Sequence, residues 1–589
     1  MTHRWMLAGA LVLLGAGLAP VAAQPPAAAR GCPQGRISSV FVDNHSVFDT
    51  ADEELDRRLL TAYRLANKLH RPTREPVIRR ELLFTEGDCY DPEVLRESER
   101  VLRAAPFIAD ADVYGIRQPD GSFHVIVDTQ DEWSTRLEPQ FDAGSETELT
   151  GLELREDNLL GSGRQASVFL LRRYGERTYG ATFATPQLFG SRWDASLAVG
   201  RTPVGGLVAQ SVSYPFVGEF GRWAFLQRAA HNTRFFEFVA PSDTGLVAVL
   251  LPEQRRVADV GVLWRTGRRG RLLLLGAGVA GEWIEYPGPA RFKRDTPGQR
   301  LVADSAFPFA LDTVDNVRGL LMAGQRNVYF VRRRALETVN GTEDVRLGVE
   351  LEAVFGHTIA GLSSGTGLSV ELGLGAAGEL PGGLLLGSRA RMEARRNSDA
   401  APGRTEWSDV FAELSGWAYW RPSESSRHTW VATVDGVGGW HTRVPFQLTL
   451  GGSSGLRGYS RHLYPGGRRA VLSLEQRSYL GWPAPDLFDL GGVVALDFGR
   501  IWAGDAPYGR NSPYLASGGF GLRFAFPPGS QRSFRLDVAW PLRAGAGPGD
   551  FALVAGIGQA IGFGTLRNDP QLERSSRRAL SPSLFSFPY

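Results

Sequence analysis

The sequence has very little cysteine: Cys32 and Cys89 are the only two in 589 residues. Two cysteines exclude a disulfide-rich scaffold and any metal site built from several cysteines. If they pair in an oxidising compartment, the disulfide closes a long loop and stabilises the fold by roughly 4 kcal/mol on the chain-entropy model. Lipid anchoring of Cys32 is the weaker alternative, because Arg30 stands where a lipobox carries a small residue.

Long apolar runs are absent beyond the N-terminus. The chain opens with a basic start, an apolar run over about 6–18 and small residues before Gln24. This pattern predicts a secretory signal peptide over 1–23, followed by a linker over 24–35. No later stretch approaches the about 18 apolar residues that a membrane-spanning helix requires. We therefore expect an exported chain without helical membrane anchors.

Charge of one sign is not in excess, since 65 Lys and Arg residues nearly balance 63 Asp and Glu residues. Near neutrality gives no support to nucleic-acid binding, which needs a concentrated basic surface. The nine histidines are scattered, and no H-E-x-x-H motif occurs. The sequence therefore predicts no metal, no cofactor and no nucleic-acid partner.

Motifs that resemble enzyme signatures lack the context that the chemistry needs. Ser363 and Ser453 each stand in a G-x-S-x-G sequence, yet neither precedes the helix that a nucleophile elbow requires. The fingerprint-like GLGAAG at 373–378 runs into a proline and more glycines instead of a helix. Adjacent carboxylates such as Asp131 and Glu132 are interpreted as solvated. We predict hairpin loops at the two serine motifs, a hairpin at the fingerprint-like motif and no catalytic site, so a hydrolase is disfavoured.

What the sequence does contain divides it into two unlike parts. Residues 36–133 are charged and mixed, with a strand-like segment, several helix-like segments and a hairpin around the turn at 119–121. In one of these helices, Asp91 is the expected N-cap and Pro92 the first helical residue. The order strand, helices, strand, strand predicts a small α+β domain.

Strand-like sequence fills most of the remainder, in a chain with 71 glycines and 35 prolines. From Trp133 onward, segments of about 10 residues alternate with turns, charged groups tend to one side, and aromatic residues recur near segment ends. A soluble multi-sheet protein would also alternate, but export and unbroken length favour a membrane barrel. The chain is predicted to be mainly β: a transmembrane antiparallel β-barrel of about 16 strands over 134–563, then an unstructured tail over 564–589.

An ordered set of motifs resembles the bacterial outer-membrane assembly and secretion superfamily of BamA, TamA and the two-partner-secretion transporters. The motifs are similar to the family's sixth-loop signature (Leu456, Arg457, Gly458, Tyr459), its inner-wall motif (Asp497, Gly499), its Glu-x-Arg strand (Glu475, Arg477) and early barrel hairpins (156–163, 186–193 and 214–223). Residues 36–133 resemble one POTRA domain, a periplasmic module that receives polypeptides. The resemblance extends over nearly the whole mature chain.

The resemblance implies that the loop with Arg457 folds back into the barrel. An arginine there would be stranded in a partly dehydrated lumen unless it met a carboxylate, and its planar fork suits a bidentate partner. We expect Asp497 to be that partner, with Glu475 second, and Tyr459 to pack the loop against the wall. The alternative is that Arg457 lies in an exposed hairpin loop.

By the same resemblance, the protein would insert or translocate polypeptides at the bacterial outer membrane, with the POTRA-like domain in the periplasm. Its partners would be the outer-membrane bilayer, unfolded or extended client polypeptides and accessory periplasmic or outer-membrane proteins. The first and last strands would close weakly. The chain departs from the family in having one POTRA-like module and a tail past the last strand. A passive pore or structural surface barrel without client handling is the competing hypothesis.

Overall fold

The computed structural model describes residues 31–48, 57–142, 148–173, 175–242, 245–293, 311–398, 406–452, 455–460, 463–558, 569–580 and 584–585. The predicted signal peptide and residues 24–30 of the predicted linker lie outside these ranges. Within them, no helix is both long and apolar enough to cross a membrane.

The N-terminal domain is built on a three-stranded sheet in the order β1-β3-β2, in which β1 is parallel to β3 and β2 antiparallel to it. Its elements follow the order strand, helices, strand, strand expected from the sequence. They are β1 (Ile37–His45), η1 (Arg57–Leu59), α2 (Leu60–Leu69), α3 (Glu75–Glu81), α4 (Pro92–Ala104), β2 (Ile108–Arg117) and β3 (Phe123–Asp131).

Helix α4 shows how the sequence determines this domain locally. Asp91 accepts a hydrogen bond from the Glu93 N–H at 2.8 Å, which satisfies one of the free donors of the first turn, and Pro92 occupies the first turn without losing a bond. Leu95 and Leu102 lie on the buried face and join the hydrophobic core of the domain. The cap thus starts the helix and the apolar period orients it toward the sheet.

Most of the remaining described chain forms a closed barrel of 20 antiparallel strands, with the short β13 (Arg291–Lys293) added beside β11. The strands are β4 (Thr135–Asp142), β5 (Glu148–Glu156), β6 (Gln165–Arg173), β7 (Glu176–Thr185), β8 (Asp194–Thr202), β9 (Gly205–Tyr214), β10 (Trp223–Ser242), β11 (Gly245–Arg268), β12 (Arg271–Glu285), β14 (Val314–Arg334), β15 (Thr342–Thr358), β16 (Gly367–Leu380), β17 (Leu384–Asn397), β18 (Trp407–Trp420), β19 (His428–Trp440), β22 (Arg468–Tyr479), β23 (Asp489–Trp502), β24 (Leu515–Ala525), β25 (Phe534–Pro541) and β26 (Ala552–Ile557).

The predicted number of about 16 strands is wrong. Strands β4, β6 and β8 have only 8, 9 and 9 residues, and tight turns join many neighbouring strands. Each strand with its turn therefore takes fewer residues than the prediction assumed, so the same length of chain makes more strands. The mainly β, antiparallel barrel architecture is as predicted.

Side chains alternate between the two faces of the barrel wall. Along β15, Val349, Leu351 and Phe355 point outward and are about half exposed, whereas Glu350 and Glu352 lie between them on the inner face. Strand β17 places arginine or glutamate at every second position over 389–395. An apolar outer wall around a charged interior is the arrangement of a transmembrane barrel.

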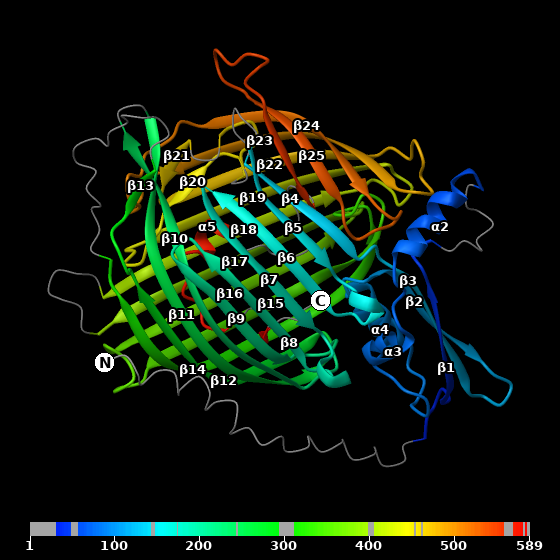
Figure 1. The fold of residues 1–589 in the computed structure, drawn as a ribbon. Coiled ribbons are helices and arrows are strands. Elements are labelled where there is room, and N and C mark those ends of the chain that lie inside the picture. Colours follow the sequence, from blue (N-terminus) through cyan, green and yellow to red (C-terminus); the bar gives the residue numbers. More distant parts are fainter. Residues whose placement is uncertain are drawn as a thin grey trace.

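The N-terminal domain docks against the turns at one end of the barrel (Figure 1). Gln187, in the turn between β7 and β8, donates to the Val77 carbonyl at 3.1 Å and to Glu81 at 2.7 Å, both on α3. Arg103 of α4 donates to both carboxylate oxygens of Asp344 at 2.9 Å. Burial raises the pKa of Glu81, although the Gln187 hydrogen bond and the charge of Arg192 oppose the shift.

The carboxylates Asp131 and Glu132, interpreted from sequence as solvated, are fully buried where the domain joins the barrel. Asp131 accepts hydrogen bonds from His70 Nε2 at 2.8 Å and from the Thr73 N–H at 2.7 Å. Glu132 accepts from Ser530, in the turn between β24 and β25, at 2.8 Å and 2.9 Å. The solvated interpretation is wrong because partners distant in the sequence replace water at these oxygens.

The tail over 564–589 is also not unstructured throughout. Residues 569–580 lie inside the barrel and begin with the short helix α5 (Pro570–Glu573), which Asp569 caps by accepting from the N–H groups of Gln571 and Leu572 (red in Figure 1). The prediction treated a polar segment as solvated, but the polar side chains of the lumen supply the partners that water would otherwise provide.

Candidate functional site

The candidate site is the loop between β19 and β22, whose described residues 441–452, 455–460 and 463–467 fold into the barrel lumen. Two short strands, β20 (Leu448–Leu450) and β21 (Tyr464–Gly466), pair within it. Leu448, Leu450 and Leu456 have no measurable exposure, which fixes the loop against the inner wall. The loop thereby carries its polar residues to the charged strands of the lumen.

Arg457 lies at the centre of the site, with its side chain 8% exposed. Its Nε and Nη2 atoms donate to the two oxygens of Asp497 at 2.8 Å and 2.7 Å, and Nη1 donates to Glu475 at 2.7 Å. Both carboxylates named from the sequence therefore contact the arginine, Asp497 bidentately. The exposed-loop alternative does not describe this geometry, because the guanidinium is buried and fully paired.

Neighbouring strands extend this contact into a buried charge network. Glu475 of β22 also accepts from Arg477 Nε at 2.9 Å. Asp537 of β25 lies 3.9 Å from Arg457 and accepts from Arg523 of β24 at 2.5 Å. Positive and negative groups alternate through the network, so each buried charge has a partner of opposite sign, which offsets its desolvation.

Two glycines make room for the loop. A Cβ on Gly499 would lie 3.1 Å from Leu450 and 3.3 Å from Leu456, so the bare backbone of β23 accommodates both leucines. Gly458 has φ +82° and would place a Cβ 2.7 Å from the backbone of Trp540. Tyr459 donates from its hydroxyl to the Ala516 carbonyl at 3.1 Å, which ties the loop to β24.

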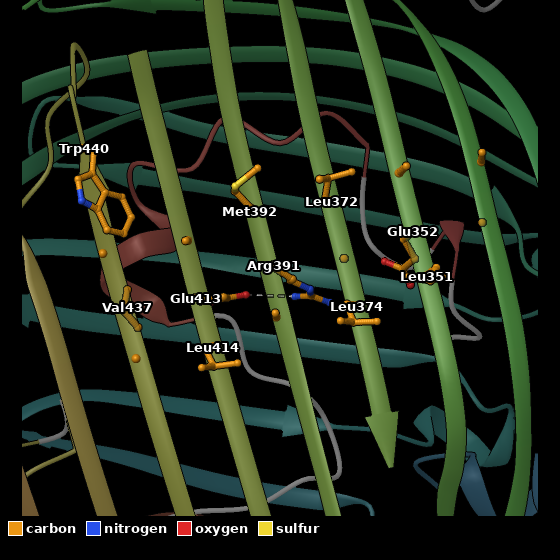
Figure 2. Close-up of a pocket in the computed structure, with 18 of the residues that line it drawn as sticks. Leu351, Glu352, Leu372, Leu374, Arg391, Met392, Glu413, Leu414, Val437 and Trp440 are labelled. Atoms are coloured by element: carbon orange, nitrogen blue, oxygen red, sulfur yellow. Dashed lines mark ion pairs between the residues drawn. The ribbon is translucent and has the colours of Figure 1, made fainter. Parts of the chain in front are cut away.

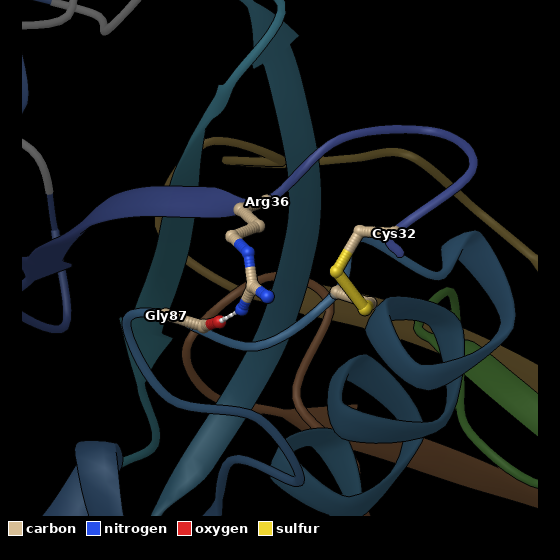
Figure 3. Close-up of a disulfide and its surroundings, with 4 residues drawn as sticks. Cys32, Arg36 and Gly87 are labelled. Atoms are coloured by element: carbon tan, nitrogen blue, oxygen red, sulfur yellow. Dashed lines mark hydrogen bonds between the residues drawn. A yellow bond between two sulfur atoms is a disulfide. The ribbon is translucent and has the colours of Figure 1, made fainter. Parts of the chain in front are cut away.

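Cys32 and Cys89 form a disulfide in the N-terminal domain (Figure 3). Beside it, Arg36 donates to the Gly87 carbonyl at 2.8 Å and forms an isolated backbone bridge with Cys89. The disulfide holds the start of the described chain against the segment that precedes α4.

The enzyme-like motifs acquire no catalytic geometry in the described residues. Ser363 donates to the Val317 carbonyl and accepts from the Val317 N–H, each at 2.9 Å, so its hydroxyl holds a turn in place. Ser453 lies outside the described residues. No group of three or more His, Cys, Asp or Glu in the described ranges is arranged to hold a metal ion.

A groove of about 880 Å³ follows the outer wall across β14 to β19 (Figure 2). Small residues such as Ala353, Ala390 and Ala412 form its floor, and Leu374 and Leu414 border it. Arg391 and Glu413, which alternate with these residues, form an ion pair at 3.6 Å on the lumen side. The groove is therefore an apolar surface on the lipid-facing side.

Sequence reasoning missed a second set of buried charges, centred on Arg577 of the tail. Arg577 Nε donates to Glu282 at 2.9 Å and Nη1 donates to Asp409 at 2.8 Å. The sequence signal for this set is the charged residue at every second position of strands such as β17. This spacing indicates a polar lumen whose charges need partners. The tail itself carries no pattern that assigns it to the lumen.

Comparison with known proteins gives likeness at the level of architecture. No family model matches the chain, and no curated protein matches it. The solved structure of BamA from Haemophilus ducreyi lacking POTRA domains 1–3 matches at 14% identity over 89% of this chain and 85% of that chain, with a TM-score of 0.35. CdiB from Escherichia coli matches at 13% identity over 91% and 93%, with a TM-score of 0.40.

OpdK from Pseudomonas aeruginosa, solved with vanillate, matches at 13% identity over 72% of this chain and 95% of that chain, with a TM-score of 0.30. The structural neighbours thus include BamA, one of the proteins named in the resemblance drawn from the motifs, together with CdiB and OpdK, at low sequence identity. At these values the likeness concerns the barrel architecture alone.

Proposed function

We propose that this protein is an outer-membrane barrel of the BamA/TamA type that inserts or translocates polypeptides, and that its N-terminal domain is a periplasmic POTRA-like module. The observation that carries the proposal is the lumen loop fixed by Arg457 to Asp497 and Glu475. A buried, bidentate contact of this kind holds a loop in one position inside the barrel. The motifs that resemble the family supply those three residues.

The apolar outer wall supports membrane insertion, because lipid can replace water only where outward side chains are apolar and every backbone group is paired within the barrel. The predicted signal peptide would export the chain before insertion. An exported barrel with this wall is suited to the outer membrane. With the N-terminal domain in the periplasm, the barrel turns that contact this domain would also face the periplasm.

The barrel closes through its shortest strands. Strand β26 has six residues and lies beside β4, which has eight, whereas β11 has 24. Fewer residues provide fewer backbone hydrogen bonds, and Gly556 removes side-chain packing from β26. We infer that this seam opens more readily than any other part of the wall, as lateral release of a client would require.

Client reception would use the edge of the N-terminal sheet. Strand β2 has β3 as its single strand partner among the described residues, and Tyr114 and Ile116 on it are each 49% exposed. An extended polypeptide can add to such an edge through backbone hydrogen bonds. The β1 edge is less accessible, since Arg36 and Cys89 form a bridge beside it.

The proposal is tested by depleting the protein and comparing the outer-membrane and secreted proteomes with those of an undepleted control. Loss of many folded barrels would indicate a general assembly factor, and loss of one or a few proteins a dedicated transporter. Complementation with Arg457→Ala should fail, whereas Arg510→Ala, at an exposed arginine of a neighbouring loop, should restore the profile. An unchanged proteome after depletion would reject polypeptide handling.

Conductance measurements distinguish the proposed function from the passive-pore alternative. Because the loop and the tail both occupy the lumen, we expect low conductance for the purified protein in planar bilayers. Steady conductance of an open pore, together with an unchanged proteome, would favour the passive pore.

A further inference from the structure

We propose that the lumen contains a binding site for a peptide segment that carries an arginine followed three residues later by an apolar residue, and that the chain's own tail fills this site as an exchangeable ligand. In the tail the two positions are Arg577 and Leu580. One part of the inference rests on the proposed function: the ligand that competes with the tail would be a client segment with an arginine and an apolar residue at the same spacing.

The lumen recognises the main chain of the tail on both sides. Arg234 donates to the Arg574 carbonyl at 2.8 Å, and Arg255 donates to the Ser576 carbonyl at 2.7 Å. Glu371 accepts from the Ala579 N–H at 2.9 Å. Side chains of the wall thus pair with several peptide groups of the tail, a form of recognition that depends on its backbone more than on its side chains.

Selectivity at the first position comes from the guanidinium of Arg577. It lies between Glu282 of β12 and Asp409 of β18, at 2.9 Å and 2.8 Å, and the backbone N–H of Arg577 donates to Glu393 of β17 at 3.1 Å. Three strands distant in sequence therefore converge on one arginine. A neutral side chain would leave the two carboxylates partly unpaired in a buried setting.

The neighbouring residue Arg578 provides a matched comparison. Its closest described carboxylate contacts are at 3.8 Å to Glu393 and 3.6 Å to Glu413, longer than hydrogen bonds. The two adjacent arginines carry the same charge but differ in contact geometry. Any effect specific to Arg577 therefore reports the site and not the charge of the tail.

Selectivity at the second position comes from an apolar pocket in the inner wall. Leu580 is 4% exposed and packs in one cluster with Leu263, Leu274 and Met322. A Cβ on Gly261 would lie 2.7 Å from Leu580, so the glycine leaves space for this side chain. Burying a leucine in such a pocket favours an apolar residue at this position.

The tail also contacts the loop that carries Arg457. Gln571 of α5 donates to Thr449 Oγ1 at 2.7 Å and accepts from the Thr449 N–H at 2.9 Å. Leu572 belongs to the same hydrophobic cluster as Leu456. Because the tail follows the last strand, it can leave the lumen without breaking any strand pair of the wall, so exchange and retention of the barrel are compatible.

The test uses the full chain with a protease recognition sequence inserted within 559–568 and cut after folding. The probe is a fluorescent synthetic peptide of residues 569–589. We expect the peptide to replace the severed tail, and the uncut chain to bind little of it. An Arg577→Ala peptide should bind at least tenfold more weakly, and an Arg578→Ala peptide less than threefold more weakly. A tail that is never replaced, or equal binding of the two variant peptides, would overturn the inference.

A second measurement does not depend on the inserted sequence. In the intact chain, Arg577→Ala should raise conductance in planar bilayers severalfold through release of the tail, whereas Arg578→Ala should not. Equal conductance of the two variants would contradict the inference. Neither assay contains a client, so failure of the proposed function would appear in the proteome and leave peptide exchange unaffected.

Discussion

At the scale of single residues, the molecule depends on buried charges whose partners come from distant strands. Arg457 contacts Asp497 and Glu475, and Arg577 contacts Glu282 and Asp409. A buried ion pair adds little net stability when it is complete, because desolvation offsets the attraction, but removing one partner leaves an uncompensated charge. Both sites therefore position segments of chain in the lumen more than they strengthen the fold.

Arg457→Ala and Asp497→Ala should each destabilise the folded-back loop by about 3 to 5 kcal/mol. The double variant should cost less than the sum of the two, because each single change already breaks the same contact. Protease accessibility of the loop as a function of denaturant concentration measures both effects in the detergent-solubilised barrel. Additive effects of the two changes would show that the residues act independently.

Gly458→Ala should destabilise the loop by about 1 to 2 kcal/mol, since the backbone has φ +82° and an added Cβ also approaches Trp540. The control is Gly529→Ala, at φ +75°, where a Cβ would meet no atom within 4 Å. Comparing the two variants separates steric contact from backbone strain. If both lose the same stability in an unfolding titration, the approach to Trp540 contributes nothing.

At the scale of elements, the N-terminal domain is fixed to the barrel by turns and not by a shared sheet. Helix α3 contacts Gln187 between β7 and β8, and Glu132 contacts Ser530 between β24 and β25. These contacts are polar and largely buried. Their strength should therefore depend on the protonation of the carboxyl groups involved.

The pKa of Glu81 is raised by burial above its ordinary value of 4.5. A carboxyl whose pKa is raised in the docked state binds protons more readily there, so docking is favoured at low pH and weakens as the pH rises above about 4.5. Hydrogen exchange of α3 should consequently increase as the pH rises above about 4.5, at rates corrected for intrinsic exchange. Glu81→Gln should flatten this dependence, and an unchanged slope would exclude Glu81 as its source.

At the scale of the whole molecule, the strands of the barrel differ in length around its circumference. Strands β14 and β15 have 21 and 17 residues, whereas β25 and β26 have 8 and 6. The long strands surround the region where the tail is bound, and the short ones form the seam with β4. Opening the seam would thus break far fewer backbone hydrogen bonds than separating β14 from β15.

The backbone amides of β25 and β26 should exchange with deuterium faster than those of β14 and β15 in the inserted protein, because fewer hydrogen bonds must break locally. Hydrogen exchange followed by mass spectrometry of the protein in lipid nanodiscs measures the difference. Equal protection of the two pairs of strands would contradict an easily opened seam.

Several features followed directly from local sequence. Asp91 and Pro92 place the start of α4, and alternating polarity identifies the strands of the wall, because capping and the two-residue period act between near neighbours. The number of strands did not follow, since short strands with tight turns and long strands with long loops have similar composition. The motif singled out Gly499, but the reason for a glycine there depends on the leucines that approach it in space.

By itself, the sequence determined the mainly β architecture, the small α+β domain before the barrel and the residues of the Arg457 motif. Only the tertiary structure decided that Asp131 and Glu132 are buried and that the tail occupies the lumen. The physical reason is that a polar segment is stable either in water or among buried partners of complementary charge, and those partners come from strands hundreds of residues away.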